Sequence, residues 1–241
     1  MSKAAELLQK TLHQSRHVHI KLLGDSITHG EGGTGFAMTG EDILSNMSRT
    51  MARNPDGYCW AKLFKEHMEA QYDCTVTNNA ISGIEIEFLL NHFHELVYDR
   101  DNLIICTIGT NNRHQRFYDG PKRTYQQQRQ YVYDLIVQLH GKLKATGKDF
   151  ILIANIPASA ANEAEAIDYG RIIHMEDIND LYKKAAEEFD FPFISMYDLF
   201  SAYCIEKQIT VDSLLADGLH PNDEGYRVMY QLIMDAFDLK P

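Results

Sequence analysis

Cysteine, proline and tryptophan are scarce in this chain of 241 residues, and long apolar runs are missing. The four cysteines, at positions 59, 74, 106 and 204, show no Cys-x-x-Cys spacing, so neither a disulfide framework nor a zinc site is indicated. No apolar stretch approaches the roughly 20 residues of a membrane-spanning helix. The N-terminal segment has no continuous apolar core and no small-residue cleavage site, so no secretory signal is indicated. We therefore expect reduced thiols, no membrane insertion and a cytoplasmic location.

Basic residues are the minority: 23 lysines and arginines stand against 34 acidic residues, a formal net charge of −11. A surface this negative repels phosphate backbones and anionic lipids, so nucleic-acid and membrane-surface partners are disfavoured. The same charge modestly favours neutral or cationic small-molecule substrates. It neither requires nor excludes a homo-oligomer.

Short apolar runs alternate with helical patterns along the chain. Apolar stripes at helical spacing recur within residues 132–143, 178–189 and 229–237, and Asn222 is placed to cap the last of these helices. This alternation predicts an α/β fold in which helices cover both faces of a parallel sheet. We expect a helical extension over residues 1–16 and a single domain over residues 17–241. The five runs that we expect as strands are His17–Leu23, Cys74–Asn78, Asn102–Ile108, Phe150–Asn155 and Pro192–Ser195.

Two segments are longer than simple connections need to be. Residues 30–57 and 157–170 follow predicted strands, on the side where α/β proteins carry their active sites. Long loops at that edge commonly shape a substrate pocket. For the second segment, a surface excursion without function is an equally good interpretation.

The first chemical motif is Gly24-Asp25-Ser26, at the end of an apolar run. It places the Ser26 hydroxyl at the carboxyl end of a strand, where outward-pointing N–H groups can stabilise negative charge. A serine at such a position is by itself more often a cap or turn residue than a nucleophile.

The second motif lies near the end of the chain, where Asp217 and His220 are three residues apart and precede Pro221. A nucleophilic serine needs a base, and the base needs an acceptor for its other N–H. One turn of chain can supply both groups. An isolated pair of this kind is more often a capped loop with a surface histidine.

Taken together, four blocks in order resemble the SGNH (GDSL) hydrolase family. Asn112 stands where the family's third block usually has Asp, which leaves Asn111 in place and concerns only a supporting contact. The blocks span nearly the whole chain, and the ordered set is far more specific than any member. They are Gly24-Asp25-Ser26-Ile27, Asn79-Ala80-Ile81-Ser82-Gly83, Gly109-Thr110-Asn111-Asn112 and Asp217-x-x-His220-Pro221.

The resemblance implies a serine esterase with a three-layer αβα sandwich, a five-stranded parallel sheet and a flavodoxin-like topology. Ser26 would attack the ester carbonyl, His220 would act as general base, and Asp217 would orient His220. The Ser26 and Gly83 backbone N–H groups and the Asn111 side chain would form the oxyanion hole. No cofactor or metal is implied, and the partner would be a small-molecule ester.

Other motifs in the sequence suggest different roles. His92 and His94 could face one way on a strand, as metal ligands do, but their surroundings predict helix, where such residues diverge. His29 is close to Ser26 and could contact substrate. The glycines between positions 24 and 35 invite a phosphate loop, yet no Gly-Lys-Ser/Thr tripeptide occurs and the dinucleotide pattern fits poorly.

Several functions remain open within and outside the resemblance. The leading hypothesis is an esterase for short-chain or acetyl esters, with carbohydrate esters among them. The alternatives within the family are a lipase or lysophospholipase and a thioesterase. Outside it, the alternatives are a non-catalytic ligand-binding module and a nucleotide- or flavin-binding protein.

Overall fold

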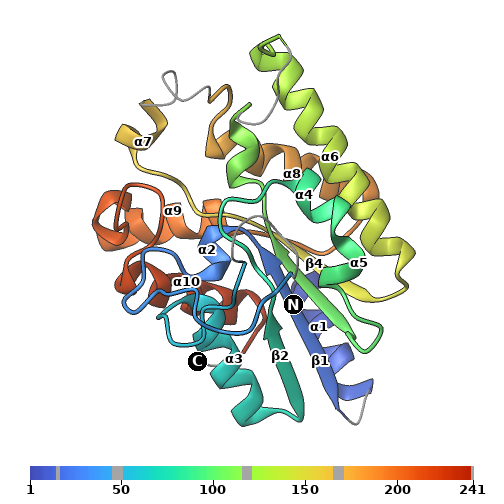
Figure 1. The fold of residues 1–241 in the computed structure, drawn as a ribbon. Helices are drawn as coiled ribbons and strands as arrows, with labels where there is room; N and C mark the ends of the chain where they lie inside the picture. Colours follow the sequence, from blue (N-terminus) through green and yellow to red (C-terminus); the bar gives the residue numbers. More distant parts are fainter. Residues whose placement is uncertain (15–16, 45–50, 116–120, 165–170, 240–241) are drawn as a thin grey trace.

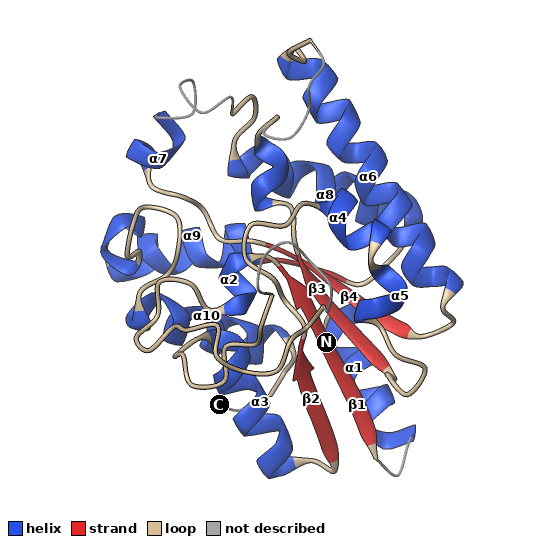
Figure 2. Cartoon of the chain, viewed as in Figure 1, coloured by secondary structure: helices blue, strands red, loops and turns tan. Residues whose placement is uncertain are grey.

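Five parallel strands form the centre of the protein (Figure 2). The computed structural model describes residues 1–14, 17–44, 51–115, 121–164 and 171–239. The strand order is β2-β1-β3-β4-β5, and each pairing is parallel. All five predicted strands are present, so the predicted α/β class and parallel sheet are confirmed. The strands are β1 (Val18–Gly24), β2 (Cys74–Asn78), β3 (Leu103–Thr107), β4 (Asp149–Ala154) and β5 (Phe193–Ser195).

Helices cover both faces of this sheet and complete the three layers (Figure 1). One face carries α1 (Lys3–Gln14), α3 (Trp60–Gln71), α9 (Met196–Lys207) and α10 (Asp223–Ala236). The other carries α4 (Ile86–Asn91), α5 (Phe93–Leu96), α6 (Tyr125–Ala145) and α8 (Met175–Phe189). The shorter elements are α2 (Ser26–His29), α7 (Ala160–Ala164) and the 3₁₀ helices η1 (Thr110–Arg113) and η3 (Val211–Leu214).

Burial on both sides of the sheet explains why the strands read as continuous apolar runs. In β3, Leu103 and Ile105 join the core on one face, whereas Ile104 and Cys106 join the core on the other. Successive side chains of a strand point to opposite faces, so a strand covered on both sides needs apolar residues at every position. Strands β1, β3 and β4 therefore contribute buried residues to both apolar cores.

Both ends of the chain contribute to the core. Leu8 of α1 is fully buried in the cluster that also contains residues of α10. The Asn222 side chain accepts a hydrogen bond from the Gly225 N–H, so the predicted cap of α10 is confirmed. The division of the chain into an extension over 1–16 and a domain over 17–241 stays a prediction, and residues 15–16 and 240–241 lie outside the described part.

The sheet order has a topological switch point between β1 and β3. The chain leaves β1 for β2 on one side and returns to β3 on the other, so the segments that follow β1 and β3 diverge. In open parallel sheets, ligands bind at such a switch point, beyond the carboxyl ends of the strands. Gly24 at the end of β1 pairs with Thr107 at the end of β3, so the two following segments start next to each other before they diverge.

The two long segments reach this same region. Gly32 packs so closely on the loop before α10 that a Cβ there would lie 2.8 Å from the His220 Cβ. In the second segment, the Ser159 N–H donates to the Gly218 carbonyl over 2.8 Å. Both segments therefore touch the loop that carries the second motif, while residues 45–50 and 165–170 lie outside the described residues. A role for either segment in shaping a pocket stays a prediction.

Candidate active site

The turn from β1 into α2 determines where Ser26 lies. Asp25 has an extended backbone, and its side chain accepts a hydrogen bond from the Ile27 N–H over 3.2 Å, which caps α2. Gly24 is needed because a Cβ there would lie 2.6 Å from the Thr107 carbonyl oxygen. Ser26 is consequently the first residue of a short helix at the carboxyl edge of the sheet (Figure 1).

The structure brings Ser26, His220 and Asp217 into direct contact. The Ser26 Oγ lies 2.8 Å from the His220 Nε2, and the His220 Nδ1 lies 2.7 Å from the Asp217 Oδ2. The other Asp217 oxygen accepts the backbone N–H groups of Leu219 and His220, at 2.9 and 2.8 Å. These backbone bonds hold the carboxylate beside the ring of a residue only three positions away.

The hydrogen bonds of His220 determine which ring nitrogen carries the proton. Because an ionised Asp217 can only accept, the Nδ1 must donate to it, and the neutral ring then presents Nε2 as an acceptor to the Ser26 hydroxyl. Burial alone would raise the pKa of Asp217, but hydrogen bonds from the ring and backbone of His220 lower it overall. The arrangement is the one in which an imidazole can take a proton from a serine.

The two further oxyanion-hole candidates are joined to each other. The Asn111 Nδ2 donates one hydrogen to the Ile84 carbonyl over 2.9 Å, so its amide retains a second hydrogen. Gly83, one residue before Ile84, has a φ of 76°, a conformation that favours glycine. The segment lies against β1 through a bond from the Ile81 N–H to the Gly24 carbonyl, over 3.0 Å.

Beneath Ser26, a buried polar network joins the ends of three strands. The Asp25 Oδ2 accepts the Asn155 Nδ2 over 2.9 Å, and the same amide nitrogen donates to the Thr110 Oγ1 over 2.6 Å. Asp25 is fully buried, and burial raises its pKa. Sequence reasoning missed Asn155, although its place directly after a predicted strand is a usable signal.

The His29 side chain is buried and hydrogen-bonded within the protein. Its ring is buried, its Nδ1 accepts the Ser82 N–H over 3.2 Å, and its Nε2 therefore donates to the Ala52 carbonyl over 3.0 Å. Burial lowers its pKa, in keeping with a neutral ring. His29 thus fastens α2 to the segment that carries Gly83, and both ring nitrogens are occupied without a substrate.

Asn112, the departure from the family pattern, has its own partners. Its Oδ1 accepts the Ile86 N–H at the start of α4 over 2.9 Å. Its Nδ2 donates to the Glu87 Oε2 over 2.6 Å, and Glu87 also accepts the Tyr131 hydroxyl. Asn112 is therefore hydrogen-bonded to the start of α4, and its amide is matched by a neighbouring carboxylate.

We expect Asn112→Asp to destabilise the protein by about 1–3 kcal/mol, because the new carboxylate would face Glu87 in a buried site. Chemical denaturation followed by circular dichroism measures this loss. The double variant Asn112→Asp/Glu87→Gln restores an amide–carboxylate pair and should recover most of the stability. A single variant as stable as wild type would show that the pairing contributes nothing.

A buried arginine ties the Asn111 segment to α7. Arg113 is fully buried, and its Nη1 donates to the Glu163 Oε1 over 3.0 Å. Burial lowers its pKa to about 10, against the opposing attraction of Glu163, so it stays charged at neutral pH. Since Ser159, just before α7, also bonds to Gly218, α7 connects the two loops that hold Asn111 and His220. Sequence reasoning did not identify this pair.

The remaining histidine motif is not assembled as a metal site. His92 lies between α4 and α5 with its Nδ1 2.8 Å from Glu95, and the His94 Nε2 lies 3.4 Å from the Lys142 Nζ. Their rings thus have different partners. Within the described ranges, no group of three or more His, Cys, Asp or Glu side chains is placed to hold a metal ion.

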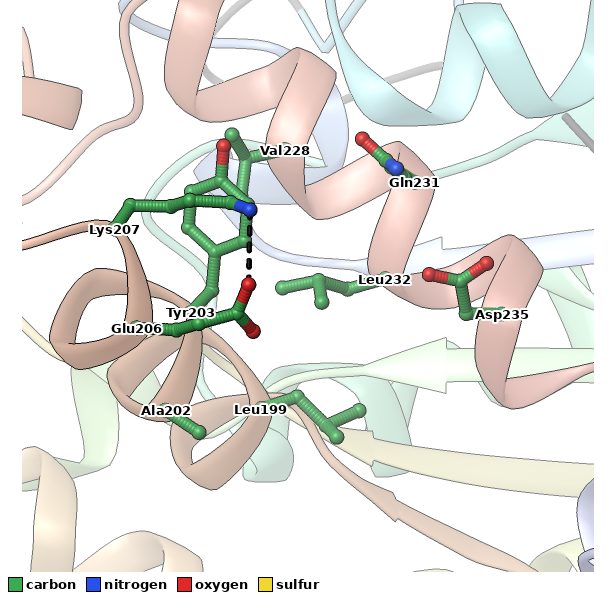
Figure 3. Close-up of a pocket in the computed structure, with 9 residues that line it drawn as sticks. All are labelled: Leu199, Ala202, Tyr203, Glu206, Lys207, Val228, Gln231, Leu232 and Asp235. Carbon is green, nitrogen blue, oxygen red and sulfur yellow. Dashed lines mark hydrogen bonds and ion pairs between the residues drawn. The ribbon is translucent and has the colours of Figure 1, made fainter.

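A surface pocket of about 530 Å³ lies between α9 and α10 (Figure 3). Its lining offers neither a serine or cysteine nucleophile nor a histidine base, and its charged pair is Lys207 with Glu206 at 2.9 Å. It contains none of the predicted site residues, so the chemistry points elsewhere. The lining residues are Leu199, Ala202, Tyr203, Glu206, Lys207, Val228, Gln231, Leu232 and Asp235.

Among the residues that the structure covers, none of the helices is both long and apolar enough to cross a bilayer.

Comparison with known proteins gives one family and several solved relatives. A variant of an acetyl xylan esterase from Geobacillus stearothermophilus is 19% identical, with a TM-score of 0.66 over 93% of this chain and 96% of that chain. A lipase/acylhydrolase from Enterococcus faecalis is 19% identical, with a TM-score of 0.60 over 93% and 98%. An alpha/beta hydrolase enzyme from the metagenome of Lake Arreo is 20% identical, with a TM-score of 0.65 over 92% and 95%. These likenesses establish the fold. No curated protein sequence matches significantly.

The family match covers most of the chain. The model of the GDSL-like Lipase/Acylhydrolase family matches residues 22–228, a range that includes all four sequence blocks. It begins inside β1, just before Ser26, and ends inside α10, after His220. The sheet, its switch point and the ordered blocks therefore agree with this match, and the chain belongs to the GDSL-like lipase/acylhydrolase family, a family of ester-bond hydrolases.

Proposed function

We propose that this protein is a serine esterase that cleaves short-chain carboxylic esters, with acetyl esters of carbohydrates as the preferred class, through an acyl-Ser26 intermediate. The observation that carries the proposal is the chain of contacts from the Ser26 Oγ to the His220 Nε2 at 2.8 Å and from the His220 Nδ1 to Asp217 at 2.7 Å. A serine, its base and an orienting carboxylate are the parts that acyl transfer requires.

In the first half of the reaction, the Ser26 Oγ attacks the ester carbonyl carbon while its proton passes to the His220 Nε2. The carbonyl oxygen becomes an oxyanion that accepts hydrogen bonds from the Ser26 and Gly83 N–H groups and from the Asn111 amide. When the intermediate collapses, the bond to the alcohol oxygen breaks, and the His220 Nε2 returns the proton to that oxygen. The alcohol leaves and the acyl group stays on Ser26.

In the second half, water replaces the alcohol. His220 takes a proton from the water as its oxygen attacks the acyl carbon, and the same oxyanion donors stabilise the new tetrahedral intermediate. Collapse then breaks the bond to the Ser26 Oγ, which recovers its proton from His220. The products are a carboxylic acid and the unmodified enzyme, with Asp217 bonded to the Nδ1–H throughout.

Limited access at the nucleophile favours a small acyl group. Ser26 is 4% exposed and His220 is 9% exposed, so little space surrounds the reacting atoms. The solved neighbour named as an acetyl xylan esterase acts, by its name, on an acetylated carbohydrate. Both observations support acetyl esters over the long-chain esters of a lipase or lysophospholipase.

Hydrolysis of p-nitrophenyl esters from acetate to palmitate by the full-length protein tests the proposal. We expect the highest kcat/KM for acetate and a steady fall as the acyl chain grows. Intact-protein mass spectrometry after rapid acid quench should show an added acetyl group. A maximum at long chains would favour the lipase alternative. A folded protein that is inert on every ester would favour the non-catalytic binding module.

A further inference from the structure

A second carboxylate lies beside the catalytic histidine, on the side opposite Asp217. The Glu31 Oε2 is 3.9 Å from the His220 Nε2, the nitrogen that also contacts the Ser26 Oγ. Asp217 lies instead at the Nδ1. In the proposed reaction, the oxygen of the departing alcohol must reach the Nε2 to receive its proton. Glu31 therefore borders the place where the alcohol part of the substrate lies.

The backbone of Glu31 is held from both sides of the site. Its N–H donates to the Ser26 carbonyl over 3.0 Å, and its carbonyl accepts the hydroxyl of the fully buried Tyr226 over 2.6 Å. The next residue, Gly32, has a φ of 95° and packs on His220. Glu31 is thus anchored both to the nucleophile's helix and to α10, so its position is built into the fold.

Among the described residues, the carboxylate of Glu31 has no hydrogen-bond partner, and His220 is its one charged-group contact. Throughout the described residues, no lysine or arginine nitrogen lies within 4.0 Å of it, and its side chain is 41% exposed. At 3.9 Å, its contact with His220 is too long for a hydrogen bond, so it does not orient the ring. A carboxylate has about four acceptor positions, which here remain available to a ligand.

We propose that Glu31 is a specificity-determining residue that binds the alcohol part of the ester, by accepting a hydrogen bond from a hydroxyl group next to the ester oxygen. This proposal rests on the esterase function proposed above. Vicinal hydroxyls of sugars are donors of this kind. A hydrogen bond from a hydroxyl to a carboxylate is stronger than a hydrogen bond between two neutral groups. The negative charge that attracts such donors also disfavours alcohols that carry a carboxylate.

Two matched substrates separate this role from general catalysis. Methyl xyloside monoacetate offers a hydroxyl beside its ester, whereas p-nitrophenyl acetate offers none. We expect Glu31→Ala to lower the ratio of kcat/KM for the sugar acetate to kcat/KM for p-nitrophenyl acetate by roughly 10- to 100-fold, the usual range for a hydrogen bond to a charged group. Glu31→Gln, which keeps the shape and one acceptor, should lower the ratio by less.

A gain of activity provides the second measurement, because no folding defect can produce it. We expect Glu31→Gln to raise kcat/KM for 2-acetoxybenzoate relative to phenyl acetate by about threefold to tenfold, since a nearby like charge is removed. The control is Glu66→Gln, an exposed glutamate of α3 whose loss changes the net charge equally. That variant should change neither ratio.

Two results would overturn the assignment of Glu31. Equal losses on the sugar acetate and on p-nitrophenyl acetate would mean that Glu31 acts through His220 rather than on the alcohol. An unchanged ratio in both variants would mean that it contacts no substrate. Failure of the esterase proposal itself is distinguishable, because the wild-type protein would then be inert on p-nitrophenyl acetate.

Discussion

Replacing Ser26 with alanine is expected to lower kcat for p-nitrophenyl acetate by about a million-fold, the order found when a catalytic serine is removed from a hydrolase triad. The hydroxyl oxygen that contacts the His220 Nε2 at 2.8 Å is the atom that bonds to the acyl carbon in the proposed mechanism, and alanine lacks it. The Ser26→Ala protein should also show no acetyl adduct by mass spectrometry. Stopped-flow and steady-state absorbance assays of the released p-nitrophenolate measure the rates.

The matched control is Ser201→Ala, in α9, whose hydroxyl donates to the Tyr197 carbonyl of the same helix over 2.7 Å. Its activity should stay close to that of the wild type. Circular dichroism should show that both variants are folded. Activity that persists in Ser26→Ala at more than about a hundredth of the wild-type rate would rule out Ser26 as the nucleophile.

The second large effect is expected for Asp217→Asn, with kcat falling by roughly 10⁴-fold. An asparagine can turn its amide nitrogen toward the His220 Nδ1, which would then have to accept a hydrogen bond. The proton would move to Nε2, so the ring would face the Ser26 hydroxyl with a donor and could not act as its base. Asp212→Asn, a carboxyl loss in η3, is the control and should keep its activity.

The same variant has a signature in the pH dependence of stability. Since hydrogen bonds from His220 lower the pKa of Asp217 overall, the ionised side chain favours the folded state above the unfolded pKa of about 3.9. That contribution is lost as the pH falls through the lower, folded-state pKa. Denaturant titrations of the wild type and of Asp217→Asn should converge in acid and separate above pH 4. A gap that stays constant from pH 2 to pH 7 would contradict this assignment.

The sheet could be predicted from sequence because its physical requirements leave a local trace. Strands buried on both faces must be apolar throughout, as in β3, and the segments between them carry the spacing of helices. The contact between Ser26 and His220 could be predicted only from the ordered blocks, because 194 positions separate the two residues. Their roles as nucleophile and base stay predictions.

The site's further residues depend on packing that no local pattern records. In the sequence, nothing distinguishes Glu31 from other glutamates. Its place beside the site results from the packing of Gly32 on His220. The pair of Asn112 with Glu87 depends on how α4 sits against η1. Asn155 differs from these residues because the sequence does carry a signal for it, although the prediction missed it. A polar residue that ends an apolar strand lies at the sheet edge that carries the site.

The distance along the chain between Ser26 and His220 also has a consequence for synthesis. At about 5–20 residues per second, a ribosome adds the histidine roughly 10 to 40 seconds after the serine. His220 lies just before α10, whose Asn222 cap and buried Tyr226 belong to the folded protein, so we expect α10 to dock before His220 and Ser26 meet. Under the proposed mechanism, a nascent chain would carry Ser26 without its base, and ester hydrolysis would start only after α10 has been synthesised.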